Sequence, residues 1–384
     1  MKRILFIIDN LNIGGIQKSL VELITAIKGS YDITVLCFDN SSNGNYALPQ
    51  SIKIIEGDKF LKMSVLERHE FKRKYGTFLS LFRFSLKLFS SYISKKIAKK
   101  VICRLSNINL HDYDVAISFS HPVPGNGLYH IENEFLIYNV SAPKKISFLH
   151  CDYLAYNNNT AYNKRLYDRI DVVAAVSRSV RECFLKALPE MEDKTQVVYN
   201  YCNVKNVRNL SAAQNITYKS TTMVTLARLS AEKGIVRCIA IIKRLKDEGY
   251  CFEWHIVGSG EMEQKIKSDI INNGLQDMVI LEGAHNNPYP FLTNANYLFI
   301  PSYHEAAPMV INEALSLNVP ILSTNTLSAK ELISDRGIGV VCSNDEESIY
   351  NMLKSTLDNP VVIQHNDIEQ FNDLSLQQFH NLVK

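Results

Sequence analysis

The chain of 384 residues is too long for one ordinary domain and fits two domains of about 150–200 residues each. Hydrophobic residues make up 46% of the sequence and charged residues 21%, and no tract is of low complexity, which excludes a largely disordered chain. The formal net charge of +3 gives no reason to expect a nucleic-acid partner.

The N-terminal segment MKRILFIIDN is expected to be a strand and not a secretory signal, because only five apolar residues separate Arg3 from Asp9. No run of about 18 apolar residues follows it. The eight cysteines include no Cys-x-x-Cys pair, so the sequence indicates neither a zinc site nor a disulfide framework. We therefore expect a cytoplasmic protein that is soluble or peripheral on the inner face of the cytoplasmic membrane.

Short β-rich runs alternate with helical patterns along the chain, which predicts an α/β fold with parallel sheets built from βαβ units. The polar stretch 203–215 is expected to be a linker between a domain at 1–202 and a domain at 216–365, with a C-terminal helix in 366–384. The predicted strands are 3–9, 32–38, 114–120, 145–150, 172–177 and 196–200, then 222–228, 252–258, 278–283, 297–302 and 320–324. Both domains are thus expected to be doubly wound, with ligands bound beyond the carboxyl ends of the strands.

Two glycine pairs follow predicted strands. Gly14 and Gly15 precede a helix, where the backbone can approach a ligand and free N–H groups can meet an anion. A tight turn that requires positive φ explains the pair equally well. Gly258 and Gly260 mark another strand-to-helix turn, which is a weak signal without a third glycine.

Fixed cations are expected after the strand at 222–228. Arg228 ends that strand and Lys233 follows near a helix start, a pair that suits a diphosphate, although ordinary surface charge is the alternative. His150 closes the strand at 145–150, where it could donate to a sugar or phosphate oxygen or serve a structural hydrogen bond. Asp112 and Asp114 precede their strand, at the wrong edge for a ligand, so no metal site is expected from them.

The segment PSYHEAAPMVINEAL, residues 301–315, places two glutamates eight positions apart. Pro308 suits the first position of a helix that would run to about Leu317, with Glu305 in the loop and Glu313 in the second turn. One carboxylate could then reach sugar hydroxyls and the other a ribose, although a capped helix with surface acids would explain either one singly. The slim loop and the first N–H groups of the helix are expected to contact the ligand through Ala306, Ala307, Pro308, Met309 and Val310.

The segment from Arg68 to Arg104 carries eleven basic residues and one acidic residue, and its apolar residues recur at helical intervals. Residues 71–100 could therefore lie on an anionic membrane, with Phe78, Phe82 and Phe89 inserted. The alternative packs the aromatic residues into the domain core and leaves the lysines in solvent.

An ordered set of motifs resembles the retaining GT-B glycosyltransferases of family 4, the glycosyl transferases group 1. The Glu-x7-Glu segment resembles the signature of that family, and the other motifs agree with it in chain order. They are GGIQKSL, KISFLHCDY, VSRSVRECF, VVYNYCNV, LARLSAEKG, HIVGSGE and GAHNNPYPFL. The usual Gly-Phe-Gly after the first glutamate is replaced by Ala-Ala-Pro in this chain, which leaves the donor sugar open.

The resemblance implies two Rossmann-like domains facing each other across a cleft, and a C-terminal helix that crosses back to the first domain. It implies that Arg228 and Lys233 bind the nucleotide diphosphate, Glu313 the ribose and Glu305 the donor sugar, with Gly258 in the donor site. His150 and the Gly14–Gly15 loop would face the reacting sugar and phosphate. Catalytic roles are thus expected for Glu305, His150, Arg228 and Lys233.

The implied reaction is metal-independent transfer, with retention, from a UDP-linked donor to a saccharide or lipid-linked saccharide in bacterial surface polysaccharide biosynthesis. No cofactor is expected. Two alternatives remain: a nucleotide-sugar epimerase on the same fold, and a catalytically silent nucleotide-sugar or membrane-binding module. The sequence identifies neither the donor base and sugar nor the acceptor.

Overall fold

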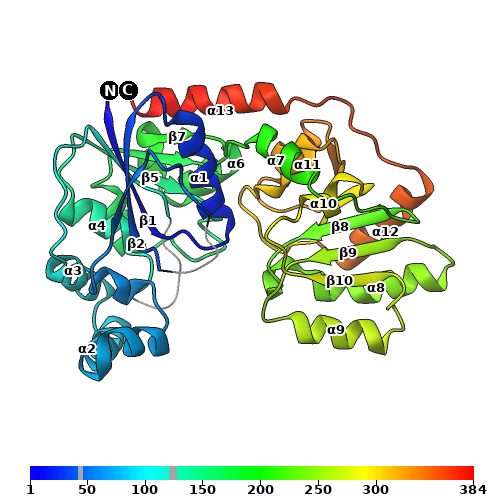
Figure 1. The fold of residues 1–384 in the computed structure, drawn as a ribbon, viewed down its shortest axis with the longest axis horizontal. Helices are drawn as coiled ribbons and strands as arrows, with labels where there is room; N and C mark the ends of the chain where they lie inside the picture. The colour runs from blue at the N-terminus through cyan, green and yellow to red at the C-terminus, as the bar shows by residue number, and fades with distance from the viewer. Residues whose placement is uncertain (42–45, 121–127) are drawn as a thin grey trace. The chain divides into compact units, whose positions relative to one another are not determined.

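The computed structural model describes residues 1–41, 46–120 and 128–384, which divide into two compact units. Unit 1 contains Met1–Tyr201 together with Leu374–Lys384, and unit 2 contains Cys202–Asp373. Each unit holds one parallel sheet with helices around it (Figure 1). The expected α/β fold, with two Rossmann-like units of the GT-B kind, is confirmed.

The sheet of unit 1 has seven strands in the order β3-β2-β1-β4-β5-β6-β7. Residues Ile4 to Ile8 of the central strand β1 are fully buried, as expected for a strand covered on both faces. The strands are β1 (Arg3–Asn10), β2 (Asp32–Asp39), β3 (Lys53–Glu56), β4 (Val115–Ser118), β5 (Lys144–Leu149), β6 (Val172–Ala175) and β7 (Thr195–Val197). The helices are α1 (Gly15–Ile27), η1 (Leu61–Ser64), α2 (Arg68–Tyr92), α3 (Lys95–Leu105), α4 (Glu132–Asn139), α5 (Ala161–Tyr167), α6 (Arg178–Ala187) and η2 (Pro189–Lys194).

The sheet of unit 2 has six strands in the order β10-β9-β8-β11-β12-β13. Helices α8, α9 and α12 pack an apolar layer that includes Trp254 onto one face, and α7, α10 and α11 lie on the other (Figure 1). The strands are β8 (Thr222–Leu226), β9 (Glu253–Val257), β10 (Val279–Gly283), β11 (Tyr297–Ile300), β12 (Ile321–Thr324) and β13 (Gly339–Cys342). The helices are α7 (Val204–Ser211), η3 (Ala231–Lys233), α8 (Ile235–Asp247), α9 (Glu263–Asn272), α10 (Tyr289–Thr293), α11 (Val310–Ser316), η4 (Lys330–Ser334) and α12 (Glu346–Asp358).

Residues 203–215, expected to be a linker, contain helix α7 and belong to unit 2. The Asn203 side chain caps this helix by accepting a hydrogen bond from the Asn206 N–H. Val204, Val207 and Ser211 are buried along one side of the helix, a spacing that the polar composition of the stretch concealed. The prediction of a linker at 203–215 is therefore wrong.

The last helix, α13 (Ile368–Leu382), begins within unit 2 and ends within unit 1. In unit 1 its Phe379 is fully buried and stacks at 6.2 Å from Phe6 of β1. Ser375 Oγ donates to the Tyr199 carbonyl at 2.5 Å. Within the described part of the chain, no helix has the length and apolar character needed to cross a bilayer.

Candidate active site

The strand order of unit 2 reverses between β8 and β11, the neighbouring strands at its centre. In open parallel sheets such a reversal leaves a crevice beyond the carboxyl ends of the two strands, and ligands bind there. The loop after β8 carries Arg228 and Lys233, and the loop after β11 carries Glu305. The structure therefore brings these three predicted residues to one edge of the sheet of unit 2.

An ion pair joins the two loops. Lys233 Nζ lies 2.7 Å from Glu305 Oε1, and the two side chains are 20% and 13% exposed. The same carboxylate oxygen accepts a hydrogen bond from Ser302 Oγ at 2.8 Å. The ammonium is thus held in place by a carboxylate that is itself fixed, in partly buried surroundings that screen charge less than bulk water does.

Arg228 lies on the same loop, with its side chain 73% exposed. Its guanidinium is 3.2 Å from Glu232 Oε1, an exposed pair that adds little to stability. The Glu232 carbonyl accepts from the Tyr303 N–H at 2.8 Å, which ties the β8 loop to the β11 loop. Arg228 is therefore a solvent-exposed cation on the loop that also carries the partly buried ammonium of Lys233.

Glycine allows the backbone to approach closely at this edge. Gly234, between η3 and α8, has φ of 67°, and a Cβ there would lie 2.1 Å from the Pro301 carbonyl oxygen. Gly258, directly after β9, has φ of 149°, and a Cβ there would lie 1.9 Å from the Ala227 carbonyl oxygen. The Gly258 turn is thus needed by the packing of β9 against the end of β8, whether or not it also contacts a ligand.

Gly258→Ala is expected to lower the free energy of unfolding by at least about 2 kcal/mol, because the residue combines strained φ with a backbone clash. Gly29→Ala is the matched control, since Gly29 has open space around its Cβ position. The control should change stability by less than about 0.5 kcal/mol. Urea unfolding followed by circular dichroism measures both, and equal midpoints for the two variants would contradict the packing role.

Helix α11 begins later than predicted, at Val310. Pro308 is not its first residue, because the Pro308 carbonyl accepts a turn bond from the Ile311 N–H, and i+4 bonding starts with Glu313 N–H to Met309 O at 3.2 Å. Glu313 therefore lies in the first turn and not in the second, and it is 5% exposed. The preceding residues Ala306, Ala307 and Pro308 are half-buried, Met309 is buried and Val310 is half-buried.

Arg237 of α8, which was not predicted from the sequence, holds the β11 loop in place. Its guanidinium donates to the Pro301 carbonyl at 2.7 Å and to Asn344 Oδ1 at 2.6 Å. It also lies over the Tyr303 ring, 3.8 Å from the centroid. The sequence signal for it was its position four residues after Lys233, near the start of the helix expected there.

In unit 1, Gly14 and Gly15 open helix α1. Gly14 is the N-cap, with an extended backbone at φ of −176°, and its carbonyl accepts from the Lys18 N–H at 3.0 Å. Neither glycine has positive φ, so a left-handed turn does not account for the pair. A Cβ on Gly15 would meet no atom within 4 Å, which leaves space beside the first turn of the helix.

His150 follows β5 in unit 1 and lies among aromatic rings. Its ring centroid is 4.8 Å from that of Phe119 and 5.7 Å from that of Phe148. Burial lowers the pKa of His150 to about 3, so the imidazole is neutral near pH 7. Among the described residues its Nε2 atom is buried without a hydrogen-bond partner, which leaves one polar atom available to a ligand.

Asp112 and Asp114 lie ahead of β4, as predicted. Asp112 has positive φ of 68°, and Asp114 Oδ2 accepts from the Arg3 N–H at 2.7 Å. The Asp114 carboxylate thus holds the start of β1 at the amino-terminal edge of the sheet, opposite to the edge where ligands bind.

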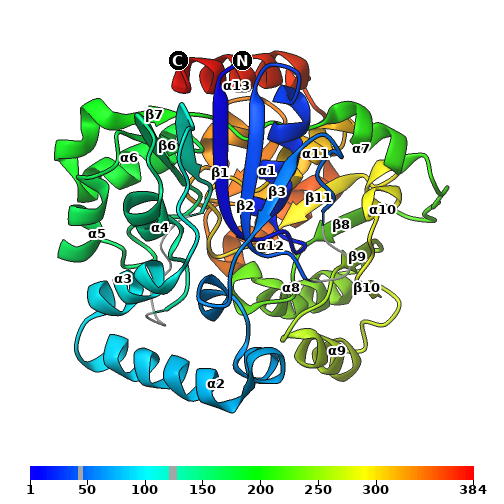
Figure 2. The ribbon, with the colours of Figure 1, turned by 60° about the vertical axis from the view of Figure 1, so that its left-hand side comes forward.

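The basic stretch forms α2, which kinks at Gly76, and α3 beside it (Figure 2). The exposure of its aromatic residues differs from one residue to the next. Phe71 is fully buried and Phe82 packs onto the same small cluster, whereas Phe78 is 84% exposed. The other large apolar residues of this region that are at least 40% exposed are Leu81, Phe84, Leu88, Tyr92, Ile93 and Ile97.

Not every lysine of this stretch is a solvent-facing charge. Lys99 is 7% exposed, and its ammonium lies 2.9 Å from Glu134 Oε1. Lys95 and Lys96 are exposed, and Lys100 lies over the Tyr138 ring at 5.2 Å. A partly basic and apolar surface on α2 and α3 therefore remains, but Lys99 belongs to the core.

Comparison with known proteins finds glycosyltransferases among the proteins that are similar to this chain. The chain is 26% identical over 212 residues, covering 54% of this chain and 57% of the relative, to a Campylobacter jejuni N-acetylgalactosamine-N,N'-diacetylbacillosaminyl-diphospho-undecaprenol 4-alpha-N-acetylgalactosaminyltransferase. A second C. jejuni protein, named GalNAc-alpha-(1->4)-GalNAc-alpha-(1->3)-diNAcBac-PP-undecaprenol alpha-1,4-N-acetyl-D-galactosaminyltransferase, is 23% identical over 353 residues, which cover 90% of this chain and 86% of the relative. Across the first curated relatives that it matches, the chain spans 29–57% of their length.

Among solved structures, Staphylococcus aureus TarM, crystallised with Fondaparinux, alpha-GlcNAc-glycerol and UDP, superposes with a TM-score of 0.69 at 13% identity. The superposition covers the full length of both chains, and the similarity at this identity is one of fold. The sequence model of the family described as glycosyl transferases group 1 matches residues 206–372, which include Arg228, Lys233, Glu305 and Glu313. Unit 2 of this chain thus carries the sequence pattern of the glycosyl transferases group 1.

Proposed function

We propose that the protein is a retaining glycosyltransferase that moves a sugar from a UDP-linked donor to a saccharide or lipid-linked saccharide in bacterial surface polysaccharide biosynthesis. The observation that carries the proposal is the Lys233–Glu305 pair at the strand-order reversal of unit 2, within the residues that match the family. A fixed ammonium with a carboxylate at its side is suited to a donor that has an anionic diphosphate next to a hydroxylated sugar.

The leaving diphosphate gains negative charge as the bond to the sugar breaks. Lys233 and the exposed Arg228 would stabilise that charge, and preorganised electrostatic stabilisation of the kind that Lys233 offers is usually a large contribution to catalysis. Glu305 would accept hydrogen bonds from the donor sugar, and Glu313 would bind the ribose. No protein nucleophile is assigned, since the departing diphosphate oxygen can take the proton of the acceptor hydroxyl.

The names of similar proteins support the choice of donor and acceptor. The TarM structure contains UDP, and the Anabaena HepE structure, which shares the fold at 15% identity, contains UDP and glucose. Both C. jejuni relatives are named for acceptors on diphospho-undecaprenol. Action at the inner face of the cytoplasmic membrane, where a lipid-linked acceptor would be available, is part of the proposal.

A donor screen followed by a product assay tests this function. Calorimetry of the purified protein against UDP, GDP, ADP and their sugar conjugates should show preferential binding of UDP-sugars. Incubation of the bound donor with and without lipid-linked saccharides then separates transfer from epimerisation, because an epimerase would convert the donor with no acceptor present. Absence of binding to every nucleotide sugar would refute the proposal.

Transfer is expected to proceed in EDTA and to give an α-linked product from an α-linked donor. The physical reason is that Lys233 and Arg228 supply the positive charge that a metal would otherwise place on the diphosphate. Proton NMR of the anomeric signal of the product measures the configuration, and the rate with and without EDTA measures the metal dependence. A β-linked product would refute retention.

Binding to anionic vesicles is expected at low salt and should weaken at high salt, because each basic residue near an anionic surface contributes about 1 kcal/mol. Lys99 is spared in the test because its loss would leave Glu134 buried without its cation. The variant that should lose flotation replaces with glutamine the exposed residues Lys72, Arg73, Lys87, Lys95 and Lys96.

The control for vesicle flotation removes the same charge from exposed positions of unit 2, with glutamine at Lys205, Lys219, Lys265, Lys267 and Lys330. This control should float as the unaltered protein does. Equal flotation of both quintuple variants would show that α2 and α3 are not the docking surface.

A further inference from the structure

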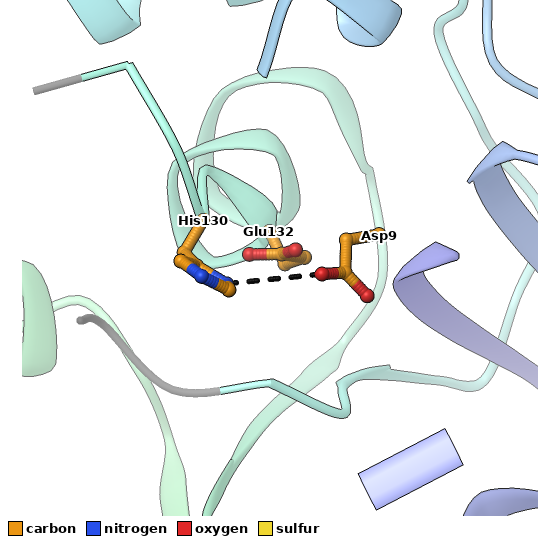
Figure 3. A group of neighbouring side chains, drawn as sticks. All are labelled: Asp9, His130 and Glu132. Carbon is orange, nitrogen blue, oxygen red and sulfur yellow. Dashed lines mark ion pairs between the residues drawn. The ribbon is translucent and has the colours of Figure 1, made fainter. Parts of the chain in front are cut away.

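A group of three side chains in unit 1 has no part in the proposed transfer. Asp9 lies near the carboxyl end of β1, His130 precedes α4, and Glu132 is the first residue of that helix. Their side chains point toward one another, with the Glu132 carboxylate next to both His130 and Asp9 (Figure 3). The group lies where the strand order of unit 1 reverses, since β1 and β4 are neighbours in the sheet.

The polar atoms of this group are buried but incompletely bonded. Glu132 is 2% exposed, and its Oε1 has no hydrogen-bond partner among the described residues. His130 Nδ1 also lacks a hydrogen bond there and lies 3.9 Å from Asp9 Oδ2. Asp9 Oδ1 instead accepts from the Asn10 N–H at 2.7 Å and from Gln17 Nε2 at 3.4 Å. A buried carboxylate in this condition is costly unless a cation or a proton joins it.

The neighbouring lysine does not supply that cation. Lys99 Nζ lies 2.9 Å from Glu134 Oε1 and donates to the His130 carbonyl at 2.9 Å. It therefore neutralises Glu134 and holds the His130 backbone, which has positive φ of 53°. Strained backbone of this kind persists where the surroundings fix it, and it is concentrated at functional sites.

We propose that Asp9, His130 and Glu132 bind one divalent transition-metal ion, for which Zn²⁺ is the probe. Their ligand atoms all lie within 4.8 Å of one another, so small side-chain movements would bring them to bonding distance of one ion. Two carboxylate oxygens and one imidazole nitrogen are typical zinc ligands, and three protein ligands leave a fourth position open. The ion would join the end of β1 to the start of α4.

This inference goes beyond the proposed transfer and does not depend on it. The cations assigned to the donor diphosphate belong to unit 2, whereas the three metal ligands belong to unit 1. The test therefore uses binding and stability, without donor or acceptor. Transfer in EDTA would leave the metal inference intact, and failure to bind zinc would leave the proposed transfer intact.

The test is a zinc titration of the protein after it has been treated with EDTA and the chelator has been removed. Calorimetry measures the binding, and thermal unfolding measures the stability. One equivalent of Zn²⁺ should bind and raise the melting temperature. Glu132→Gln and His130→Asn should each weaken binding at least tenfold. Asparagine is chosen at position 130 because it tolerates left-handed φ. His111→Asn is the matched control, since His111 is exposed and outside the group, and it should bind as the unaltered protein does.

Cobalt substitution identifies the ligands. The Co²⁺ absorption spectrum should lack a thiolate-to-metal charge-transfer band and should disappear in Asp9→Asn, which also serves if either other variant fails to fold. Unchanged zinc affinity in Glu132→Gln, His130→Asn and Asp9→Asn would overturn the proposal and place the ion elsewhere. Absence of zinc binding by the unaltered protein would also overturn it and leave a proton as the occupant, since burial raises the pKa of the Glu132 carboxyl well above its ordinary value.

Discussion

Replacing Lys233 with alanine is expected to lower kcat/KM about 10²–10³-fold, the usual cost of removing one preorganised group that stabilises a developing anion. Lys233 is suited to this role because Glu305 holds its ammonium at 2.7 Å and because the pair is only partly exposed. Steady-state kinetics with a saturating acceptor measures the loss. The effect should appear in kcat as well as in KM, since the charge on the diphosphate grows in the transition state.

Lys243→Ala is the matched control for Lys233→Ala. Lys243 lies on α8 of the same unit, and its ammonium pairs with Asp247 one helical turn away, outside the candidate site. The control should retain kcat/KM within about twofold, because Lys243 lies outside the candidate site. Its loss should also leave the protein folded, since an exposed pair of this kind contributes less than about 1 kcal/mol to stability. If Lys233→Ala keeps nearly full activity while folded, the ion pair is a structural link between two loops and the assignment to the diphosphate is wrong.

The two glutamates of the 301–315 segment are expected to differ when each is replaced by glutamine. Glu305→Gln should lower kcat about 10–100-fold with little change in donor KM, because its hydrogen bonds to the donor sugar tighten as charge develops. Glu313→Gln should mainly raise the donor KM through weaker ribose binding. Glutamine keeps the volume of both side chains, which matters for Glu313 because it is 5% exposed and truncation would leave a cavity.

The Ser302→Ala variant tests whether Glu305 contacts the donor directly or acts by positioning Lys233. Ser302 Oγ donates to the same carboxylate oxygen that pairs with Lys233, so its removal loosens Glu305 without removing the charge. A loss of kcat smaller than that of Glu305→Gln supports direct contact between the carboxylate and the donor. Equal losses would assign Glu305 to the positioning of Lys233, and unchanged kinetics in Glu305→Gln and Glu313→Gln would return both to structural roles.

The loops of unit 2 were predictable because each follows a buried apolar strand. The runs that became β8 and β11 are apolar and short, so the positions of Arg228, Lys233 and Glu305 at strand ends follow from local pattern alone. Their proximity follows only from the strand order, which places β8 beside β11. The start of α11 was misplaced by two residues because Pro308 fits several positions near a helix start.

Two edge strands could not be predicted, because their sequences lack a clear apolar pattern. Strands β3 and β13 lie at the edges of their sheets and have four residues each, and Ile54 of β3 is 39% exposed. A short strand with one covered face lacks the apolar run that marks a central strand. The Asp9, His130 and Glu132 group was missed for a different reason, since parts of the chain more than a hundred residues apart meet only when β4 pairs with β1.

Helix α13 has a consequence for the order in which the protein is made. Unit 1 needs Leu374–Lys384 to bury Phe379 against β1 and to bond the backbone at Tyr199, yet all of Cys202–Asp373 is synthesised before those residues. Unit 2 is continuous in sequence, so its sheet can form while unit 1 still lacks the part of α13 that belongs to it. On the ribosome, therefore, the first unit to begin is the last to finish, and β1 depends on segments such as α13 that are translated about 370 residues later.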